Sequence, residues 1–179
     1  MKIKFLIALS AIALIVTSCG DDEEPIGKFS YPVRLDFDHG LSNYQSYRTG
    51  DNAHSGKVYS RADSAVNFGF YYSYVLPDSL VGKNIIVDVD AWVRTGDLSN
   101  YCDVIVSAKG NDSLVLWQGC GTREAIKAPN EWTNVKKTAY ISAANTSKNN
   151  FIIEILAHNI DAKSYFDVDD VMITYSEQD

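Results

Sequence analysis

The stretch Ile85-Ile86-Val87-Asp88-Val89-Asp90-Ala91-Trp92-Val93-Arg94 decides the fold class of this chain. Apolar and mostly polar side chains alternate along it. The apolar positions are Val87, Val89, Ala91 and Val93, and the positions between them are Asp88, Asp90, Trp92 and Arg94. Side chains two residues apart lie on the same face of a β-strand. The stretch is therefore predicted to be a strand with one buried face and one outward face.

Similar short runs, rich in β-branched and aromatic residues, recur along the chain and are separated by Gly, Asn, Asp and Pro. The predicted strands are Val33–Asp38, Lys57–Ala62, Val66–Leu76, Ile85–Arg94, Tyr101–Ala108, Leu114–Gln118, Trp132–Ile141, Asn150–His158 and Tyr165–Tyr175. Helical periodicity is poor, and the best helical segment, Thr122–Ala128, is short. This pattern predicts an all-β fold, a two-sheet antiparallel β-sandwich.

The phase of the other strands supports the same arrangement. In the strand that ends at His158, the residues Phe151, Ile153, Ile155 and Ala157 are expected to face the core, with Glu154 and His158 outward. The segment Lys109-Gly110-Asn111-Asp112 is expected to form a hairpin turn, because Gly and Asn readily adopt positive φ.

The N-terminal segment predicts where the protein works. Lys2 and Lys4 precede a 12-residue apolar block, Phe5 to Val16, which fits a secretory signal peptide and is too short to span a bilayer. The segment Val16-Thr17-Ser18-Cys19 resembles the lipobox of bacterial lipoproteins, which are cleaved before the cysteine and lipidated on its sulfur. This resemblance implies a signal peptide over residues 1–18, lipidation at Cys19 and a tether over 19–30. The strand pattern then assigns the β-sandwich domain to residues 31–177.

The acidic run Asp21-Asp22-Glu23-Glu24 follows the lipidated cysteine. It has one interpretation as a solvated, extended tether, because like charges repel. It also resembles the acidic export signal of surface lipoproteins in Bacteroidota. The resemblance implies an outer-membrane lipoprotein at the cell surface, with a periplasm-facing protein as the alternative.

Composition excludes one class of partner. The chain has 16 Lys and Arg and 23 Asp and Glu, a net charge of −7. Removal of residues 1–18 takes away two lysines and no acids, which leaves 161 residues with a net charge of −9. An acidic domain does not attract a phosphate backbone, so nucleic acid is not expected as a partner.

Cys102 and Cys120 remain in the mature chain. In an oxidising compartment they could form a disulfide across a strand–turn–strand unit, and the alternative is two free thiols. Pairing would require their Cα atoms to lie within ~7 Å.

Several short motifs occur in a suggestive order. They are Leu35-Asp36-Phe37-Asp38, Ala53-His54-Ser55-Gly56-Lys57-Val58-Tyr59-Ser60, Val89-Asp90-Ala91-Trp92-Val93-Arg94, Glu131-Trp132-Thr133-Asn134-Val135 and Tyr165-Phe166-Asp167-Val168-Asp169-Asp170-Val171-Met172-Ile173. Together they resemble the galactose-binding-like jelly roll of carbohydrate-binding modules. The resemblance covers most of residues 31–175 and implies a sandwich that binds carbohydrate without catalysis.

The same resemblance implies one structural calcium ion. Its ligands would be Asp38, Ser55, Lys57 through its carbonyl, and Asp169. Calcium accepts carboxylate and carbonyl oxygens readily. The first strand has Asp38 where a longer Glu is common, which puts the site in doubt, and the alternative is that these acids are ordinary turn and edge residues.

No catalytic motif accompanies these features. The mature chain has only His39, His54 and His158, and no Gly-x-Ser-x-Gly elbow. Asp88 and Asp90 lie side by side on one strand, whereas glycosidase acids flank the scissile bond. We therefore expect the protein not to be an enzyme.

Sugar binding requires exposed aromatic rings beside polar side chains. The expected ligand-binding residues are Trp92, Asp88, Asp90, Arg94, Trp117 and Tyr101. Neighbouring strands could add Tyr71, Asp103 and Arg61 to the row that contains Trp92. A glycan is the expected partner, and the alternative is a structural or assembly lipoprotein whose sandwich docks onto another protein.

Overall fold

The computed structural model describes residues 32–39 and 46–178. Within them it contains ten strands, two four-residue helices and one 3-10 turn. The strands are β1 (Val33–Leu35), β2 (Tyr47–Thr49), β3 (Val58–Ala62), β4 (Phe68–Val75), β5 (Ile85–Thr95), β6 (Cys102–Gly110), β7 (Ser113–Gly119), β8 (Thr133–Ile141), β9 (Ile152–Asn159) and β10 (Phe166–Glu177). The helices are α1 (Thr122–Ala125) and α2 (Ala143–Thr146), and the 3-10 turn is Asp78–Leu80.

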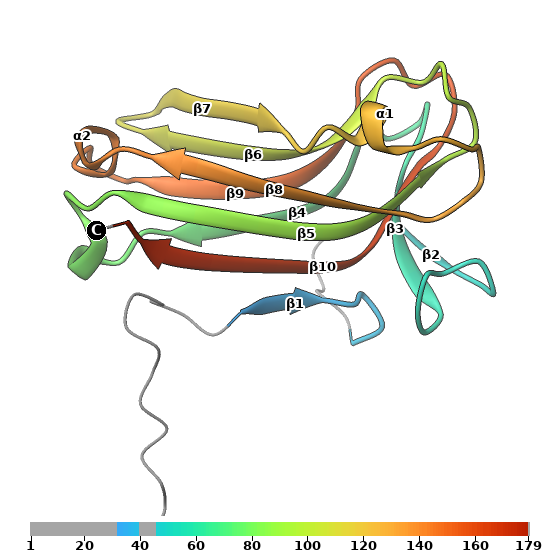
Figure 1. Cartoon of the computed structure of the whole chain (residues 1–179), viewed down its shortest axis with the longest axis horizontal. Helices are drawn as coiled ribbons and strands as arrows, with labels where there is room; N and C mark the ends of the chain where they lie inside the picture. Colours follow the sequence, from blue (N-terminus) through green and yellow to red (C-terminus); the bar gives the residue numbers. More distant parts are fainter. Residues whose placement is uncertain (1–31, 40–45, 179) are drawn as a thin grey trace, which may run out of the picture.

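The strands form two antiparallel sheets that pack face to face (Figure 1). The six-stranded sheet has the order β2-β3-β10-β5-β8, with β1 pairing to β10 as well. The four-stranded sheet has the order β4-β9-β6-β7. The predicted all-β, two-sheet sandwich is confirmed.

The core lies between the sheets and is built by the predicted alternation. Val87, Val89, Ala91 and Val93 of β5 are at most 2% exposed. The inward residues of β9 are buried in the same cluster. The predicted hairpin is also present, since Asn111 and Asp112 join β6 to β7 with φ values of 52° and 57°. Two positive φ values in a two-residue turn match the right-handed twist of the flanking strands.

The first strands differ from the prediction. β1 ends at Leu35, because Phe37 adopts a φ of 59° and the chain turns there. β2 was not predicted, since Tyr47–Thr49 is too short to show a period-two pattern. It forms an edge strand on β3.

β10 has a bulge at Asp170 and Val171, where its register against β5 shifts between Asp169 and Met172. Asp170 adopts a φ of 47° at this point. Before the bulge β10 pairs with β3, and after it with β1. A bulge bends a strand and re-aims its side chains. This one brings two consecutive carboxylates to the outer side of the six-stranded sheet, against the loop before β3.

Cys102 and Cys120 are free and buried, which corrects the disulfide alternative. The Cys120 N–H donates to the carbonyl of Val104, so Cys120 lies opposite a residue two positions along β6 from Cys102. Two residues of strand span about 7 Å, to which the spacing between strands is added. Burial raises the pKa of each thiol to about 12, so both stay protonated.

The predictions for the N-terminal segment concern residues outside those that the structure describes. They are the signal peptide over 1–18, lipidation at Cys19 and the tether over 19–30. Among residues 32–39 and 46–178, no helix has the length and apolarity that crossing a membrane would need.

Candidate functional site

The sequence-predicted binding residues lie on opposite sides of the sandwich. Trp92 belongs to β5 of the six-stranded sheet, and Trp117 belongs to β7 of the four-stranded sheet. Tyr71 and Asp103 lie in β4 and β6, so they belong to the sheet of Trp117 and not, as expected, to that of Trp92. The residues therefore cannot form one site.

The outer surface of the four-stranded sheet has a cluster of aromatic rings, which we call the aromatic face and define by Phe68, His158 and Trp117. Phe68 is 50% exposed and Trp117 is 46% exposed. The rings of Phe68 and His158 are stacked, 4.5 Å apart and 15° from parallel. The ring of Trp117 stands at 86° to that of His158, with 6.1 Å between centroids. The face thus offers two aromatic surfaces at a right angle.

The strand register places a carboxylate beside these rings. Trp117 pairs with Ser107, which pairs with Glu154, so the three form one row across β7, β6 and β9. Glu154 is only 5% exposed, although it points away from the core. Acidic side chains are rarely buried unless they are paired. An acid sequestered on an outer face is therefore an unusual feature.

Three side chains hold the Glu154 carboxylate. The Tyr71 hydroxyl donates to Oε1. The Ser107 hydroxyl donates to Oε2 at 3.3 Å, and Lys109 Nζ lies 2.9 Å from Oε2. Burial by itself would raise the pKa of Glu154, but these hydrogen bonds and the charge of Lys109 outweigh it, so the pKa is lowered. The carboxylate is ionised at neutral pH and fixed in place.

The centre of the aromatic face is apolar. Ile105 and Leu156 pair with each other between the row of Glu154 and that of His158, and both are at most 4% exposed. Burial lowers the pKa of His158, so its ring is neutral near pH 7. The arrangement can hold a ligand by ring stacking, with the exposed Lys109 as a polar partner that the buried Glu154 keeps in place.

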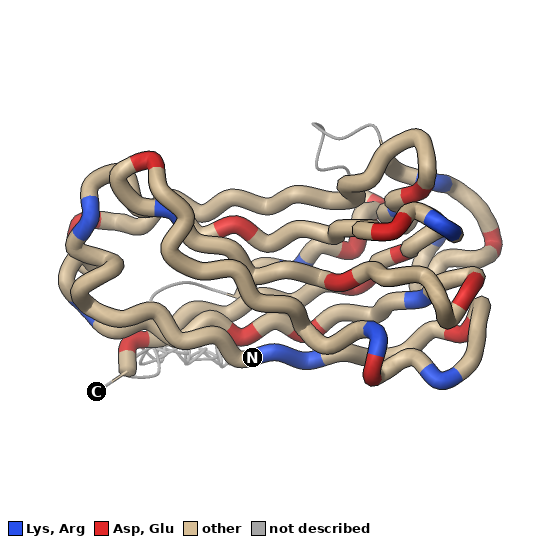
Figure 2. Tube along the Cα trace, turned by 90° about the horizontal axis from the view of Figure 1, so that it is seen from above, with Lys and Arg blue, Asp and Glu red and all other residues tan. Residues whose placement is uncertain are grey.

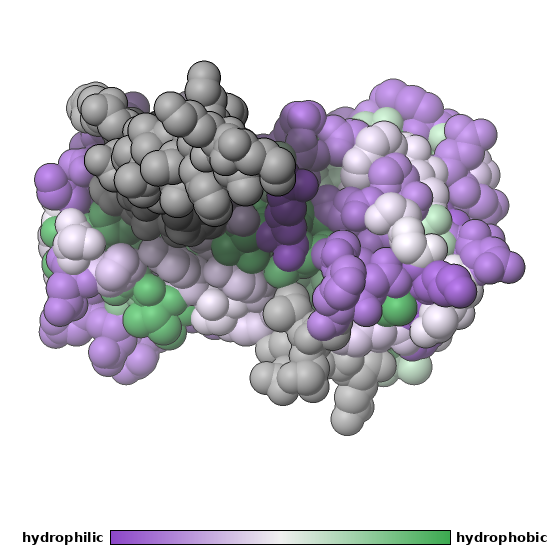
Figure 3. All heavy atoms as spheres, turned by 90° about the horizontal axis from the view of Figure 1, so that it is seen from below, coloured by the Kyte–Doolittle hydropathy of each residue, from purple (hydrophilic) through white to green (hydrophobic). Residues whose placement is uncertain are grey.

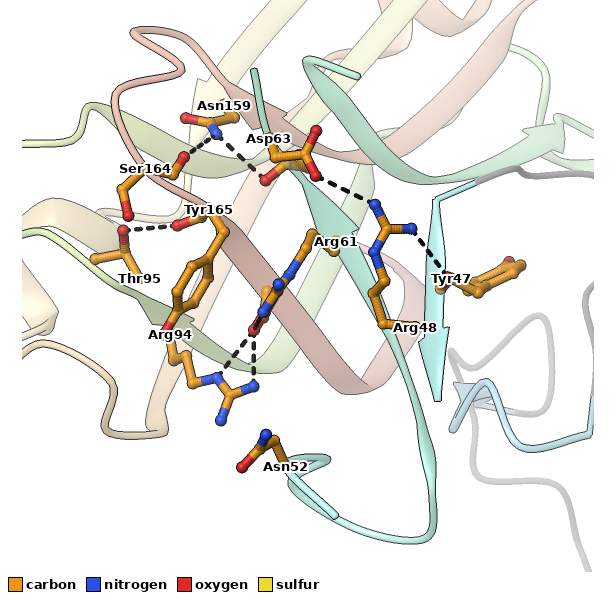
Figure 4. Close-up of polar contacts among 12 residues, drawn as sticks. Tyr47, Arg48, Asn52, Arg61, Asp63, Arg94, Thr95, Asn159, Ser164 and Tyr165 are labelled. Carbon is orange, nitrogen blue, oxygen red and sulfur yellow. Dashed lines mark hydrogen bonds and ion pairs between the residues drawn. The ribbon is translucent and has the colours of Figure 1, made fainter. Parts of the chain in front are cut away.

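Arg94 is not a surface residue, which corrects its predicted role in ligand binding. It is 7% exposed, and its Nε and Nη2 donate to Asp167 Oδ2 at 3.0 and 2.8 Å. Arg61 donates to the same carboxylate at 2.6 and 2.8 Å. Figure 4 shows Arg61 and Arg94 converging beside the ring of Tyr165. The guanidinium of Arg94 also lies over Trp132, 4.5 Å from the ring centroid. Arg94, Arg61 and Asp167 therefore pair with one another and pack against aromatic rings, which is a structural role.

Tyr101 is 43% exposed and lies just before β6. The guanidinium of Arg123 lies 5.7 Å from the centroid of its ring. Asp103, the outward neighbour, accepts hydrogen bonds from the backbone N–H groups of Cys120, Gly121 and Thr122. Its carboxylate therefore holds the turn before α1 and is not available to a ligand.

The residues implied as calcium ligands surround the loop from His54 to Val58. Asp38 Oδ1 accepts the N–H groups of Lys57 and Val58 at 2.8 and 3.0 Å. Asp169 Oδ2 accepts those of His54 and Ser55, and Oδ1 accepts that of Asp170. The carboxylates therefore clamp the loop from two sides.

This arrangement does not fit a calcium ion. N–H groups aimed at a carboxylate present their positive ends where a cation would sit. Among residues 32–39 and 46–178, no three His, Cys, Asp or Glu side chains are grouped so as to hold a metal. Burial raises the pKa of Asp169 to about 6, and the charge of Asp170 adds to this effect. The ion stays a prediction from sequence that solution measurement must test.

Chelation should leave the melting temperature of the domain unchanged, because backbone N–H groups already satisfy both carboxylates. An ion at 100 times its Kd would contribute about 2.7 kcal/mol. Its removal would lower the melting temperature by roughly 5–10 °C in a domain of this size. Thermal melts with EDTA and with added Ca²⁺ measure the difference. A fall of several degrees that Ca²⁺ reverses and Mg²⁺ does not would restore the calcium site.

The same loop contains a serine, a histidine and an aspartate in contact, but not in a catalytic order. The Ser55 hydroxyl donates to Asp170 Oδ1, and His54 Nδ1 lies 2.5 Å from Asp170 Oδ2. Activation of a serine requires the hydroxyl to bond the imidazole, with the carboxylate behind it. Here the carboxylate bridges the two, so the geometry does not support nucleophilic catalysis.

Phe68, Glu154 and His158 were not among the predicted binding residues. The phase of β9 already placed Glu154 and His158 outward, which is the only signal that the sequence offered for them. Their grouping with Trp117 depends on the pairing of β9 with β4 and β6.

Comparison with known proteins gives no match to any family model and none to any curated protein. Among solved structures, the chain is similar to the CBM22-1 xylan-binding domain of Paenibacillus barcinonensis Xyn10C. The TM-score is 0.46 at 14% identity, over 86% of this chain and 90% of that one. It is also similar to TmCBM61 in complex with β-1,4-galactotriose, with a TM-score of 0.34 at 15% identity over 82% and 90% of the two chains.

A third similar structure is the K3 adhesin domain of Lys-gingipain from Porphyromonas gingivalis. Its TM-score is 0.40 at 18% identity, and the match covers 79% of this chain and 96% of that one. The likeness to carbohydrate-binding modules and adhesin domains is distant. What this chain binds must be argued from its own residues.

Proposed function

We propose that this protein is a non-catalytic carbohydrate-binding protein and that the aromatic face holds the sugar. The observation that carries the proposal is the row Trp117, Ser107, Glu154, in which an exposed indole and a buried, fixed carboxylate lie on one sheet surface. Pyranose rings have apolar C–H faces and hydroxyl edges. The first can stack on Trp117, and the second can accept a hydrogen bond from Lys109, the exposed partner of Glu154.

The geometry favours an oligosaccharide over a single sugar. Trp117 and Glu154 are two strand spacings apart, about 10 Å. A ligand that stacks on Trp117 and also reaches the Lys109 ammonium group beside Glu154 must be longer than one ring. The perpendicular ring of His158, backed by Phe68, closes one side of this path.

Charge favours a neutral glycan. Acidic positions lie along the strands as well as in the loops (Figure 2). The chain has a net charge of −7. An ionised Glu154 adds to this negative charge and repels carboxylate or sulfate groups. Polysaccharides with those groups are therefore expected to bind weakly.

A panel of neutral and acidic oligosaccharides tests this function by isothermal titration calorimetry. We expect binding to at least one neutral hexasaccharide, weaker binding of the matching monosaccharide, and no binding to polygalacturonate. Absence of heat with every neutral glycan, confirmed by affinity gel electrophoresis with the polymers, would refute the proposal.

The alternative function, docking onto a partner protein, has one supporting observation. Val75 is 67% exposed and Leu114 is 56% exposed, on the two edge strands of the four-stranded sheet. Together with Phe68 they enlarge the apolar surface of that side. This function would be supported if the protein binds no glycan and co-purifies with a partner protein. The Phe68→Ser substitution should then abolish the co-purification.

The proposed location follows from sequence. We propose a lipid anchor at Cys19, with residues 19–30 as the tether that holds the sandwich away from an outer membrane. The acidic run after Cys19 favours the cell surface, and a periplasm-facing anchor is the alternative. The sequence patterns alone support this part of the proposal.

A further inference from the structure

We propose that the outer surface of the six-stranded sheet is a second carbohydrate-binding site, so that one domain can hold two glycan chains. This inference extends the proposed function but depends on different residues. Trp92 and Trp117 lie on different sheets of the sandwich, and each sheet's outer face points away from the other. A single ligand cannot reach both.

A groove crosses this second surface. Two hollows of about 470 and 230 Å³ adjoin, and both are lined by Asp90 and Met172. Ligand pockets commonly have volumes of about 300–1,000 Å³. The strand register explains the groove, because Arg34, Met172, Asp90 and Lys136 form one row across β1, β10, β5 and β8. Three strand spacings give a length of about 14 Å.

Trp92 forms the aromatic part of the larger hollow. It is half-buried, and its ring is stacked with that of His54 at 3.9 Å and 16° from parallel. His54 is itself held by Asp170, whose Oδ2 lies 2.5 Å from Nδ1. The indole is therefore fixed before any ligand arrives. Rigid binding groups lose less conformational entropy on binding.

The polar groups of the groove are paired with one another. Lys136 Nζ lies 2.5 Å from Asp90 Oδ2, and the Asn134 amide donates to Oδ1 at 2.6 Å. The Thr138 hydroxyl donates to Asp88 at 2.5 Å. Because these charges are paired, the groove has hydrogen-bonding groups but no large electrostatic potential of a single sign. Such a surface suits the hydroxyls of a neutral sugar better than a phosphate or a strongly charged peptide.

One end of the molecule beside the groove is polar. Figure 3, which shows the molecule from the side of β1, has hydrophilic side chains over much of the end that contains β2 and β3. Two sites that face opposite ways would let the domain cross-link polysaccharide chains, which raises avidity through effective concentration.

Indole N–H resonances test the proposal, because the three tryptophans lie at different places. In ¹H–¹⁵N spectra of the protein, assigned with Trp→Phe variants, cellohexaose, xylohexaose and mannohexaose are titrated in turn. We expect saturable shifts of both the Trp92 and the Trp117 signals, with a calorimetric stoichiometry of two. Trp92→Ala should lower the stoichiometry to one and abolish precipitation of the polymer by the protein.

Because Trp92→Ala could disturb the loop that packs on it, Arg34→Ala serves as a second variant. Arg34 is exposed at the edge of the groove, and its loss should weaken only the second site. Tyr140→Ala, on the same sheet outside the groove, is the control. Shifts of Trp117 alone would overturn the second site and leave the proposed function intact. Shifts of Trp92 alone would overturn the aromatic face instead, and no shift of either would overturn both.

Discussion

Replacement of Asp167 with alanine should destabilise the domain by about 3–5 kcal/mol, because it leaves the buried guanidinium group of Arg94 and the half-buried one of Arg61 without their anion. Asp167 is fully buried and accepts hydrogen bonds from both Arg61 and Arg94. The Arg94 side chain is 9% exposed, so water cannot replace the lost partner. Removal of one member of a buried ion pair costs more than the pair itself contributes.

Thermal and denaturant unfolding measure this effect, and we expect the melting temperature to fall by about 10 °C or more. Asp161→Ala is the matched control. Asp161 is also paired, with Lys163 at 3.0 Å, but it is exposed at the surface. Surface pairs contribute about 0–1 kcal/mol. A loss below about 1 kcal/mol for Asp167→Ala would show that the cluster is not an energetic anchor.

Replacement of Trp117 with alanine should weaken oligosaccharide binding at least about tenfold, which corresponds to about 1.4 kcal/mol. The indole is the largest exposed ring of the aromatic face, and stacking on it would be lost entirely. Stability should change by less than about 1 kcal/mol, since substitutions at exposed positions usually have small effects. Calorimetry and thermal melts of the same samples separate the two quantities.

Tyr140→Ala is the matched control for Trp117→Ala. Tyr140 is 60% exposed and lies on β8, an edge strand of the other sheet. It should bind glycan as the unmodified protein does. Unchanged affinity in Trp117→Ala, or an equal loss in both variants, would contradict the assignment of the aromatic face as the main site.

The strands could be predicted because the signal is local. Period-two alternation in β5 and β9 reports directly which side chains are buried, and the turn between β6 and β7 needs residues that tolerate positive φ. The sequence did not predict β2 or the early end of β1, since three residues are too few to show an alternation of apolar and polar side chains.

The site was harder to predict because the pattern along a strand does not reveal its neighbours. Arg94 has the phase of an outward residue, yet Asp167 and the surrounding rings bury it. Asp103 reads as a free surface acid, but its oxygens cap the turn before α1. In both cases the covering groups come from segments distant in sequence.

Apolar alternation in the sequence was enough to establish the all-β class and the core-facing residues of β5 and β9. The tertiary structure alone decided that Trp92 and Trp117 face opposite ways, that Glu154 lies in one row with Trp117, and that Asp38 and Asp169 clamp a loop. The physical reason is that alternation is a property of one strand. The outer surface of a sheet is assembled by hydrogen bonding between strands far apart in the chain, and no local pattern records that choice.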